Sequence, residues 1–219
     1  MKSLKLFYPF LCSVLCYQVL GKETIFIDLS KNTDRQVIVD KEDGQYLGHP
    51  TTTLLNDGKT VLCVYPKGHG KGAIVYKKSD DGGKSWSERL ETPNNWTSSK
   101  EVPTLFQVKD QKGKERIVMF SGLYPIRMAT SEKNGKTWSE LNPNGDFGGI
   151  VAMGTMIKDL KNPGHYRALF HDDGRFIAEG SKKQNPVMFT LYNSLSTDGG
   201  MTWQNPKEIF SSSFIHLCE

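Results

Sequence analysis

Cysteine is scarce in this sequence, and its net charge is small. The chain has 219 residues with four cysteines, and 28 Lys and Arg against 24 Asp and Glu leave a formal net charge of +4. So small a charge predicts no nucleic-acid partner. Cys12 and Cys16 lie in an N-terminal apolar stretch, and the two remaining cysteines are too few for a disulfide scaffold. Cys63 stands in the apolar run of residues 61–65 and is expected to be a buried core thiol.

Motifs for metals, nucleotides and nucleophilic serines are also missing. No His, Cys or Asp cluster has zinc or EF-hand spacing, and there is no G-x-S-x-G or dinucleotide motif. We therefore expect no metal and no cofactor. No segment keeps a 3.6-residue apolar stripe over three turns, which excludes helical repeats.

Only the N-terminus approaches the ~18 apolar residues of a membrane span. Lys2 and Lys5 precede a mostly apolar stretch that ends at Gly21. This pattern predicts a secretory signal peptide over residues 1–21, and hence a secreted chain, extracellular or periplasmic, with no stable membrane span after cleavage. An uncleaved anchor helix is the alternative.

Three segments of the chain resemble one another. Each has an apolar run, a turn with glycine, a second apolar run and a third short strand, which is typical of a β-hairpin with an added strand. The three sets cover residues 50–55, 60–65 and 73–76, then 103–108, 116–120 and 126–130, and finally 153–157, 166–170 and 187–192.

Each third strand runs into a turn of the pattern S-x-D-x-G-x-[ST]-W, although Lys133 replaces the Asp in the middle copy. The carboxylate can accept bonds from turn amides, glycine takes a positive φ, and the tryptophan covers the apolar side of the turn. The pattern residues are Ser79, Asp81, Gly83 and Trp86, then Ser131, Gly135 and Trp138, and finally Ser196, Asp198, Gly200 and Trp203.

The repeat length indicates the fold class. Thr51, Thr104 and Thr155 open the three units and lie 53 and 51 residues apart. A period near fifty with about four strands per unit predicts an all-β chain built of propeller blades.

A strand–Asp-box–strand repeat in a secreted chain resembles the sialidase (neuraminidase) superfamily, whose catalytic domain is a six-bladed β-propeller. Six blades need roughly 330 residues, and this chain holds three units. Residues 22–219 are therefore expected to form the N-terminal half of a sialidase-type propeller, inactive alone. A small propeller closed by dimerisation is the alternative.

The resemblance implies roles for particular residues. The family has an Arg that clamps the substrate carboxylate at the position that corresponds to residue 48, two residues before Pro50. This chain has Gly48 at that position, followed by His49. Glu101, two residues before Pro103, matches the acid/base carboxylate, and its alternative is a solvent-facing Glu at a strand end. Glu219 matches the Glu that assists the nucleophilic Tyr, while that Tyr and two further clamping Arg would follow residue 219.

Three loops join the second and third strands of the units, and we expect them to gather at one mouth of the propeller. The first is the Gly-rich stretch of residues 66–72, which no helix follows, so a phosphate loop is excluded. Flexible or Asp-Gly turns are the alternative interpretation of these loops. With His49, the expected substrate contacts are Lys67, His69, Arg127, His171, Asp172 and Arg175.

The sequence therefore predicts a secreted, sialidase-like exo-glycosidase that removes a terminal acidic sugar from a glycan or sialoside-like substrate. One alternative is a non-catalytic carbohydrate-binding propeller that keeps the Asp-boxes, since the Arg before Pro50 is missing. Another is a propeller hydrolase for a different acidic sugar.

Overall fold

The computed structural model describes residues 25–214. The expected signal peptide and Glu219 lie outside this range, as do Cys12, Cys16 and Cys218. The chain divides into two compact units, Met1–Gln36 and Val37–Glu219. The described part of the first unit contains one short 3-10 helix, η1 (Thr33–Arg35). No helix among the described residues is long and apolar enough to cross a membrane.

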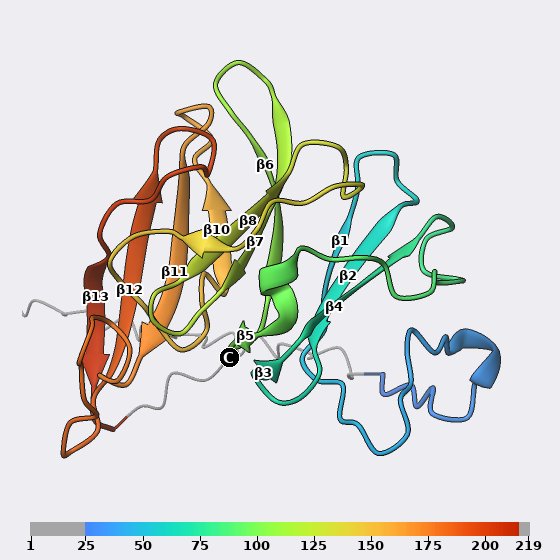
Figure 1. Ribbon diagram of the computed structural model, residues 1–219, viewed down its shortest axis with the longest axis horizontal. Coiled ribbons are helices and arrows are strands. Elements are labelled where there is room, and N and C mark those ends of the chain that lie inside the picture. Colours follow the sequence, from blue (N-terminus) through green and yellow to red (C-terminus); the bar gives the residue numbers. More distant parts are fainter. Residues whose placement is uncertain (1–24, 215–219) are drawn as a thin grey trace, which may run out of the picture. The chain divides into compact units, whose positions relative to one another are not determined.

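The second unit is built almost entirely of antiparallel sheets (Figure 1). Within the described range this unit has one short helix, the 3-10 turn η2 (Asn94–Thr97). Sheet 1 contains β1 (Thr51–Leu54), β2 (Val61–Pro66) and β4 (Ile74–Ser79). Sheet 2 contains β6 (Thr104–Lys109), β7 (Glu115–Ser121), β8 (Arg127–Ser131) and β9 (Asn142–Pro143). Sheet 3 contains β10 (Thr155–Lys158), β11 (Tyr166–Asp172), β12 (Phe189–Ser196) and β13 (Lys207–Ser212).

All three predicted hairpins and third strands are present, within a few residues of the expected bounds. In the first hairpin Thr51 pairs with Val64 and Leu54 with Val61. The outer strands β9 and β13 add the fourth strand to sheets 2 and 3, whereas sheet 1 has three strands. A separate ladder joins β3 (Lys71–Gly72) to β5 (Ser99–Lys100), and so links sheet 1 to the segment that leads into sheet 2.

Apolar faces of neighbouring sheets form two cores. Leu62 and Val64 of sheet 1 share one buried cluster with Ile117 and Met119 of sheet 2. The alternate residues of β7, among them Phe120, face the other way and share the second cluster with sheet 3. This alternation explains why β7 reads as a continuous apolar run, because a strand covered on both faces buries every side chain.

The first and third Gly-Trp turns hold the hydrogen bonds that the sequence pattern predicts. In the first turn the hydroxyl of Ser79 donates to Asp81 (2.7 Å), and Asp81 also accepts bonds from the amide and the hydroxyl of Ser85. The indole of Trp86 donates to the carbonyl of Gly83 (3.1 Å), which has a φ of 89°. The corresponding bonds recur at Ser196, Asp198, Thr202, Trp203 and Gly200.

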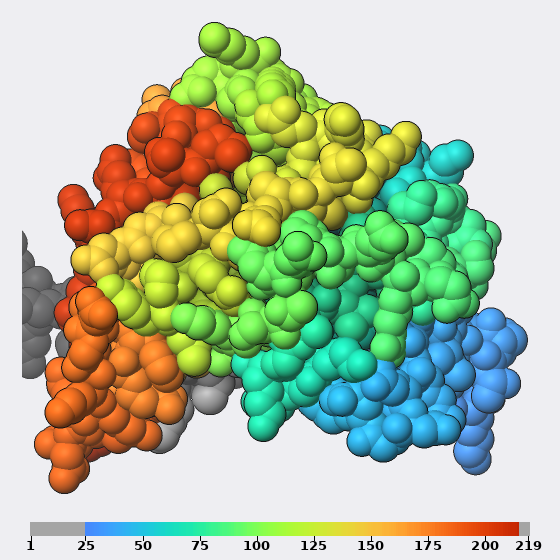
Figure 2. All heavy atoms as spheres, viewed as in Figure 1, coloured from blue at the N-terminus to red at the C-terminus, as the bar shows by residue number. Residues whose placement is uncertain are grey.

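A long connection also crosses between sheets 1 and 2. Asn95 donates to the carbonyl of Leu141 (2.9 Å) and accepts from its amide (3.0 Å), so that its side chain imitates a strand neighbour. Figure 2 shows the green segment around residue 95 beside the yellow segment around residue 141. Trp96, next in the chain, is fully buried in the first core.

Candidate functional site

The starts of the inner strands β1, β6 and β10 lie at the same end of the sheets as the three loops singled out in the sequence. We call these segments, residues 48–51, 66–73, 98–104, 121–127, 148–155 and 171–189, the rim. Hydrogen bonds connect neighbouring segments: Gly48 to Pro66 (3.4 Å), Glu101 to Gly70 (2.9 Å), the amide of Lys100 to the hydroxyl of Ser121 (3.2 Å), Gly149 to Leu123 (3.0 Å) and Ile150 to His171 (2.8 Å). The rim is therefore one continuous edge made by three sheets.

Two threonines tie the inner strands β1 and β6 to the segments that lead into the next sheet. The hydroxyl of Thr51 donates to the carbonyl of Pro103 (2.7 Å), and that of Thr104 donates to the carbonyl of Ala152 (3.0 Å). Thr51 and Thr104 open equivalent strands, so the same bond recurs at both junctions. These bonds fix the spacing of neighbouring strand starts and hence of the side chains on the rim.

Glu101 occupies the junction between sheets 1 and 2. Its backbone has a φ of 79°, which is uncommon for a residue with a side chain. Its amide donates to Gly70, and its Oε1 accepts a bond from the amide of Val102 (3.3 Å). A Cβ on Gly70 would lie 2.8 Å from Oε1, so glycine is needed there for the carboxylate to rest against the loop. The Gly-rich loop is thus packed against the side chain of Glu101.

His69, the neighbour of Gly70, contacts His49 from the start of β1. Nε2 of His49 lies 2.8 Å from Nδ1 of His69, and the two rings meet edge to face. One nitrogen must donate and the other accept, so this bond requires at least one neutral ring. The structure therefore brings His49, His69 and Glu101 together.

Lys67 is held by acidic residues that precede β1. Its ammonium pairs with Glu42 (2.9 Å), which also pairs with Arg89 (2.5 Å). Arg89 in turn contacts Asp40 (2.7 Å). Burial acts to raise the pKa of Asp40, but hydrogen bonds from Arg89 and Tyr65 hold it below the ordinary value. This network fixes the base of the Gly-rich loop.

Arg127 turns inward from the rim. It donates to the carbonyl of Ser98 (2.7 Å) and to the hydroxyl of Ser121 (3.3 Å), and its buried Nε has no partner. Burial lowers the pKa of its guanidinium. Arg127 therefore pins the segment that carries Glu101 to sheet 2, and its role as an anion contact stays a prediction.

The third loop holds its acidic residues deep inside. Asp172 is fully buried and accepts bonds from the amides of Gly174 (2.6 Å) and Phe176 (3.1 Å). Burial raises the pKa of its carboxyl, and the amide bonds oppose this. Asp173 is also buried and pairs with Arg175 (2.7 Å). The amide bonds to Asp172 hold the loop in its conformation, and Arg175 is held by its ion pair with Asp173.

His171, the residue before this pair, borders a small hollow on the open face of sheet 3. The hollow has a volume of about 300 Å³ and is also lined by Thr155, Leu169 and Leu191. The ring of His171 lies near that of Phe189, with 6.3 Å between centroids. His171 lies in β11 of sheet 3, whereas Glu101 lies in the segment between β5 and β6.

Sequence reasoning missed Tyr46, a residue that is 58% exposed and whose ring lies near that of His69. Its signal was its place two residues before Gly48, in the stretch compared with the family's clamp. It also missed Lys100, whose ammonium donates to the carbonyl of Tyr124 (3.1 Å).

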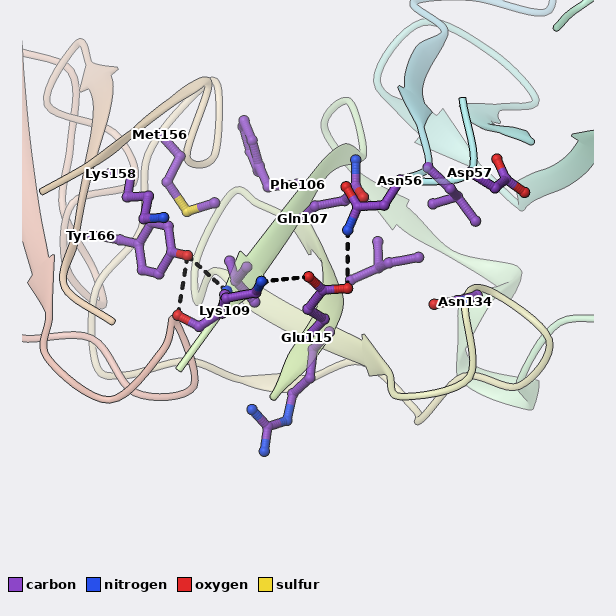
Figure 3. A pocket seen from close by; sticks show the side chains of 14 residues that line it. Asn56, Asp57, Phe106, Gln107, Lys109, Glu115, Asn134, Met156, Lys158 and Tyr166 are labelled. Carbon is purple, nitrogen blue, oxygen red and sulfur yellow. Dashed lines mark hydrogen bonds and ion pairs between the residues drawn. The ribbon is translucent and has the colours of Figure 1, made fainter. Parts of the chain in front are cut away.

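A pocket of about 380 Å³ lies at the opposite end of the sheets (Figure 3). Lys109 pairs there with Glu115 (2.7 Å), which accepts a bond from Asn56 (2.9 Å). The hydroxyl of Tyr166 accepts from the amide of Lys109 (2.7 Å). None of the predicted site residues lines this pocket, and its polar groups link the three sheets to one another.

Among the described residues, no group of three or more His, Cys, Asp or Glu side chains could hold a metal ion.

No protein-family model matches the chain, and no curated protein matches its sequence. Its fold is similar to a solved GH93 α-L-arabinofuranosidase of Fusarium graminearum in complex with arabinobiose. The TM-score is 0.53 at 16% identity, over 78% of this chain and 51% of that one. The chain has the fold of a partial β-propeller.

A second similar structure is a mutant of an α-L-arabinofuranosidase from the same fungus with an iminosugar inhibitor. It has a TM-score of 0.50 and 15% identity over 74% of this chain and 48% of that one. The chain thus spans about half the length of these solved structures. At such identities the likeness establishes the propeller fold, with sheets 1, 2 and 3 as its blades.

Proposed function

We propose that this chain is part of a secreted β-propeller glycoside hydrolase that removes a terminal sugar from a glycan, with Glu101 as the general acid/base. The observation that carries the proposal is the placement of Glu101 at the junction of two blades, on the rim. Its carboxylate rests against Gly70, one residue from the His49–His69 pair.

A general acid in glycoside hydrolysis protonates the oxygen of the leaving group. Glu101 is half-buried. Its uncommon backbone conformation and its bond to Gly70 hold it in place, and strained residues of this kind cluster at functional sites.

The remaining rim residues serve the substrate in this proposal. His49 and His69 contact sugar hydroxyls beside Glu101, and Lys67, Arg127, His171 and Arg175 border the approach from the three loops. Asp172 shapes the third loop through its amide bonds. Glu219, outside the described residues, would assist a nucleophile from later in the full-length protein.

Two classes of sugar compete for this site. The Asp-box pattern supports a sialidase-type enzyme for a terminal acidic sugar. The absence of an Arg before Pro50, where Gly48 stands, favours another sugar, and the names of the two similar structures are those of arabinofuranosidases. Secretion is part of the proposal and rests on the N-terminal pattern.

Hydrolysis of a panel of aryl glycosides by the full-length protein tests the proposal. The panel contains an α-sialoside, an α-L-arabinofuranoside and aryl pyranosides. At least one should be cleaved, and Glu101→Gln should lower kcat/KM by roughly 10²–10⁴-fold, the usual contribution of a positioned acid/base. Glu91→Gln, at an exposed carboxylate outside the rim, is the matched control and should leave the rate unchanged.

Cleavage that Glu101→Gln leaves unchanged would remove Glu101 from its role. If no glycoside is cleaved although the panel sugars bind, the chain belongs to the alternative class, a carbohydrate-binding propeller without catalysis.

A further inference from the structure

Tyr46 presents an open aromatic face at the edge of the rim. The residue is 58% exposed. Its backbone is held, because the side chain of Gln45 donates to the carbonyl of Tyr46 (2.9 Å). A fixed aromatic ring beside polar groups is a common feature of ligand sites.

Gly48 makes this position of the ring possible. A Cβ on Gly48 would lie 2.2 Å from Cε1 of Tyr46 and 2.9 Å from its Cζ. Any side chain at position 48 would therefore collide with the ring. Gly48 thus stands where the sialidase resemblance expects an Arg before Pro50, and its lack of a side chain leaves room for the ring of Tyr46.

The ring adjoins the cluster around Glu101. Its centroid lies 6.5 Å from that of His69, with the two planes tilted by 31°. The hydrogen bond between His49 and His69 fixes His69 in turn, and the carboxylate of Glu101 rests against Gly70 of the same loop. A sugar that lies on Tyr46 would thus have nitrogen donors or acceptors at its edge and a carboxyl nearby.

Three of the described cations near this cluster are already engaged. Lys67 pairs with Glu42 (2.9 Å), Lys100 donates to the carbonyl of Tyr124 (3.1 Å), and Arg127 donates to the carbonyl of Ser98 (2.7 Å). Lys71 of the same loop is exposed. The carboxyl of Glu101, which rests against Gly70 of this loop, would repel a carboxylate-bearing sugar when it is ionised, whereas an uncharged sugar meets no such repulsion.

We infer that Tyr46, with Gly48 beneath it, is the stacking platform of a subsite for an uncharged sugar ring. This inference deepens the proposed function and rests on it. The axial C–H bonds of a sugar form an apolar patch with partial positive charge, which suits the negative face of an aromatic ring. His69 and His49 bind the hydroxyls at the ring's edge.

Binding measurements in the Glu101→Gln variant, in which turnover should be strongly slowed, separate this inference from catalysis. In that background the full-length protein is titrated with arabinobiose, lactose, xylobiose and sialyllactose by calorimetry. At least one uncharged disaccharide should bind more tightly than sialyllactose, and Tyr46→Ala should weaken its affinity about tenfold. Leu160→Ala, an exposed apolar residue at the other end of blade 3, is the control and should change nothing.

A double-mutant cycle tests the part of Gly48. Gly48→Ala should weaken the affinity as Tyr46→Ala does, because the methyl group displaces the ring. The double variant should be no weaker than Tyr46→Ala alone, since both changes remove the same platform. Circular dichroism of each variant establishes that it is folded.

Three results would overturn the inference: affinity that Tyr46→Ala does not change, tighter binding of sialyllactose than of every uncharged sugar, or no binding of any uncharged sugar. Tyr46-dependent binding without hydrolysis in the wild-type protein would leave the subsite standing and reject the proposed catalysis. Hydrolysis by the wild-type protein with a KM that Tyr46→Ala does not change would support the proposed catalysis and reject the subsite.

Discussion

The hydroxyl of Tyr76 in blade 1 donates a hydrogen bond of 2.8 Å to the carbonyl of Gly135 in blade 2. In the first and third Gly-Trp turns the equivalent carbonyl accepts the indole of its own turn's tryptophan. In the middle turn Trp138 instead packs edge to face against Tyr76 and Trp96. The turn that lacks the Asp is therefore completed by a residue of the neighbouring blade.

Tyr76→Phe should lower the free energy of unfolding by about 1–3 kcal/mol, because it leaves the buried carbonyl of Gly135 without its donor. Urea unfolding followed by tryptophan fluorescence measures the change. Tyr46→Phe, at a ring that is largely exposed, should unfold like the wild type. Equal midpoints for Tyr76→Phe and the wild type would mean that the bond contributes nothing.

Asp81 should make the stability of the protein sensitive to acid. The hydroxyl and amide of Ser85 and the hydroxyl of Ser79 lower the pKa of its carboxyl from 3.8 to about 2. A lowered folded-state pKa gives stability that is complete above the unfolded value and is lost as the pH falls from about 4 to about 2. The gap in thermal midpoint between wild type and Asp81→Asn should therefore close over this interval. A gap that stays constant would contradict this account.

Cys63 should resist modification in the folded protein. Burial raises the pKa of its thiol to about 11, and only the thiolate reacts readily. Native protein treated with iodoacetamide near neutral pH should show an unmodified Cys63 peptide by mass spectrometry. The same peptide should be modified after denaturation. Equal rates in both states would show that the thiol is accessible.

Asn95→Asp should destabilise the contact with Leu141. The new carboxylate keeps the acceptor for the amide of Leu141 but sets an oxygen against its carbonyl, which should cost about 1–3 kcal/mol near neutral pH. Protonation of the introduced group restores a donor, so the loss should shrink in acid. Asn94→Asp, at the exposed neighbouring position, is the control. A loss of the same size in both variants would contradict the proposed geometry.

The blades could be predicted from the sequence because their signals are local. Alternating or continuous apolar runs, a glycine turn and a terminal Gly-Trp turn lie within about fifty residues in each unit. The outer strand β13 was not predicted, since residues 207–212 have no clear alternation and all of its first four residues are exposed. Pairing with β12 makes it a strand.

The rim was predictable only in outline. Equivalent loops follow equivalent strands, so their gathering at one end follows from the repeat. The partners of individual residues do not, because Lys67 and Glu42, or Gly70 and Glu101, meet only after the sheets have packed. Gly70 illustrates this limit: the sequence shows a Gly-rich stretch, and only the structure identifies Glu101 as the group that rests against it.

The central claim is that Glu101 protonates the leaving group. It is tested most directly by comparing how much a Glu101 variant slows the cleavage of two substrates with different leaving groups. Glu101→Ala should slow cleavage of a disaccharide, which needs an acid, by roughly 10²–10⁴-fold. Cleavage of the dinitrophenyl glycoside of the same sugar, whose leaving group needs no proton, should be slowed far less. Equal losses for both substrates would contradict the role of Glu101 as the acid.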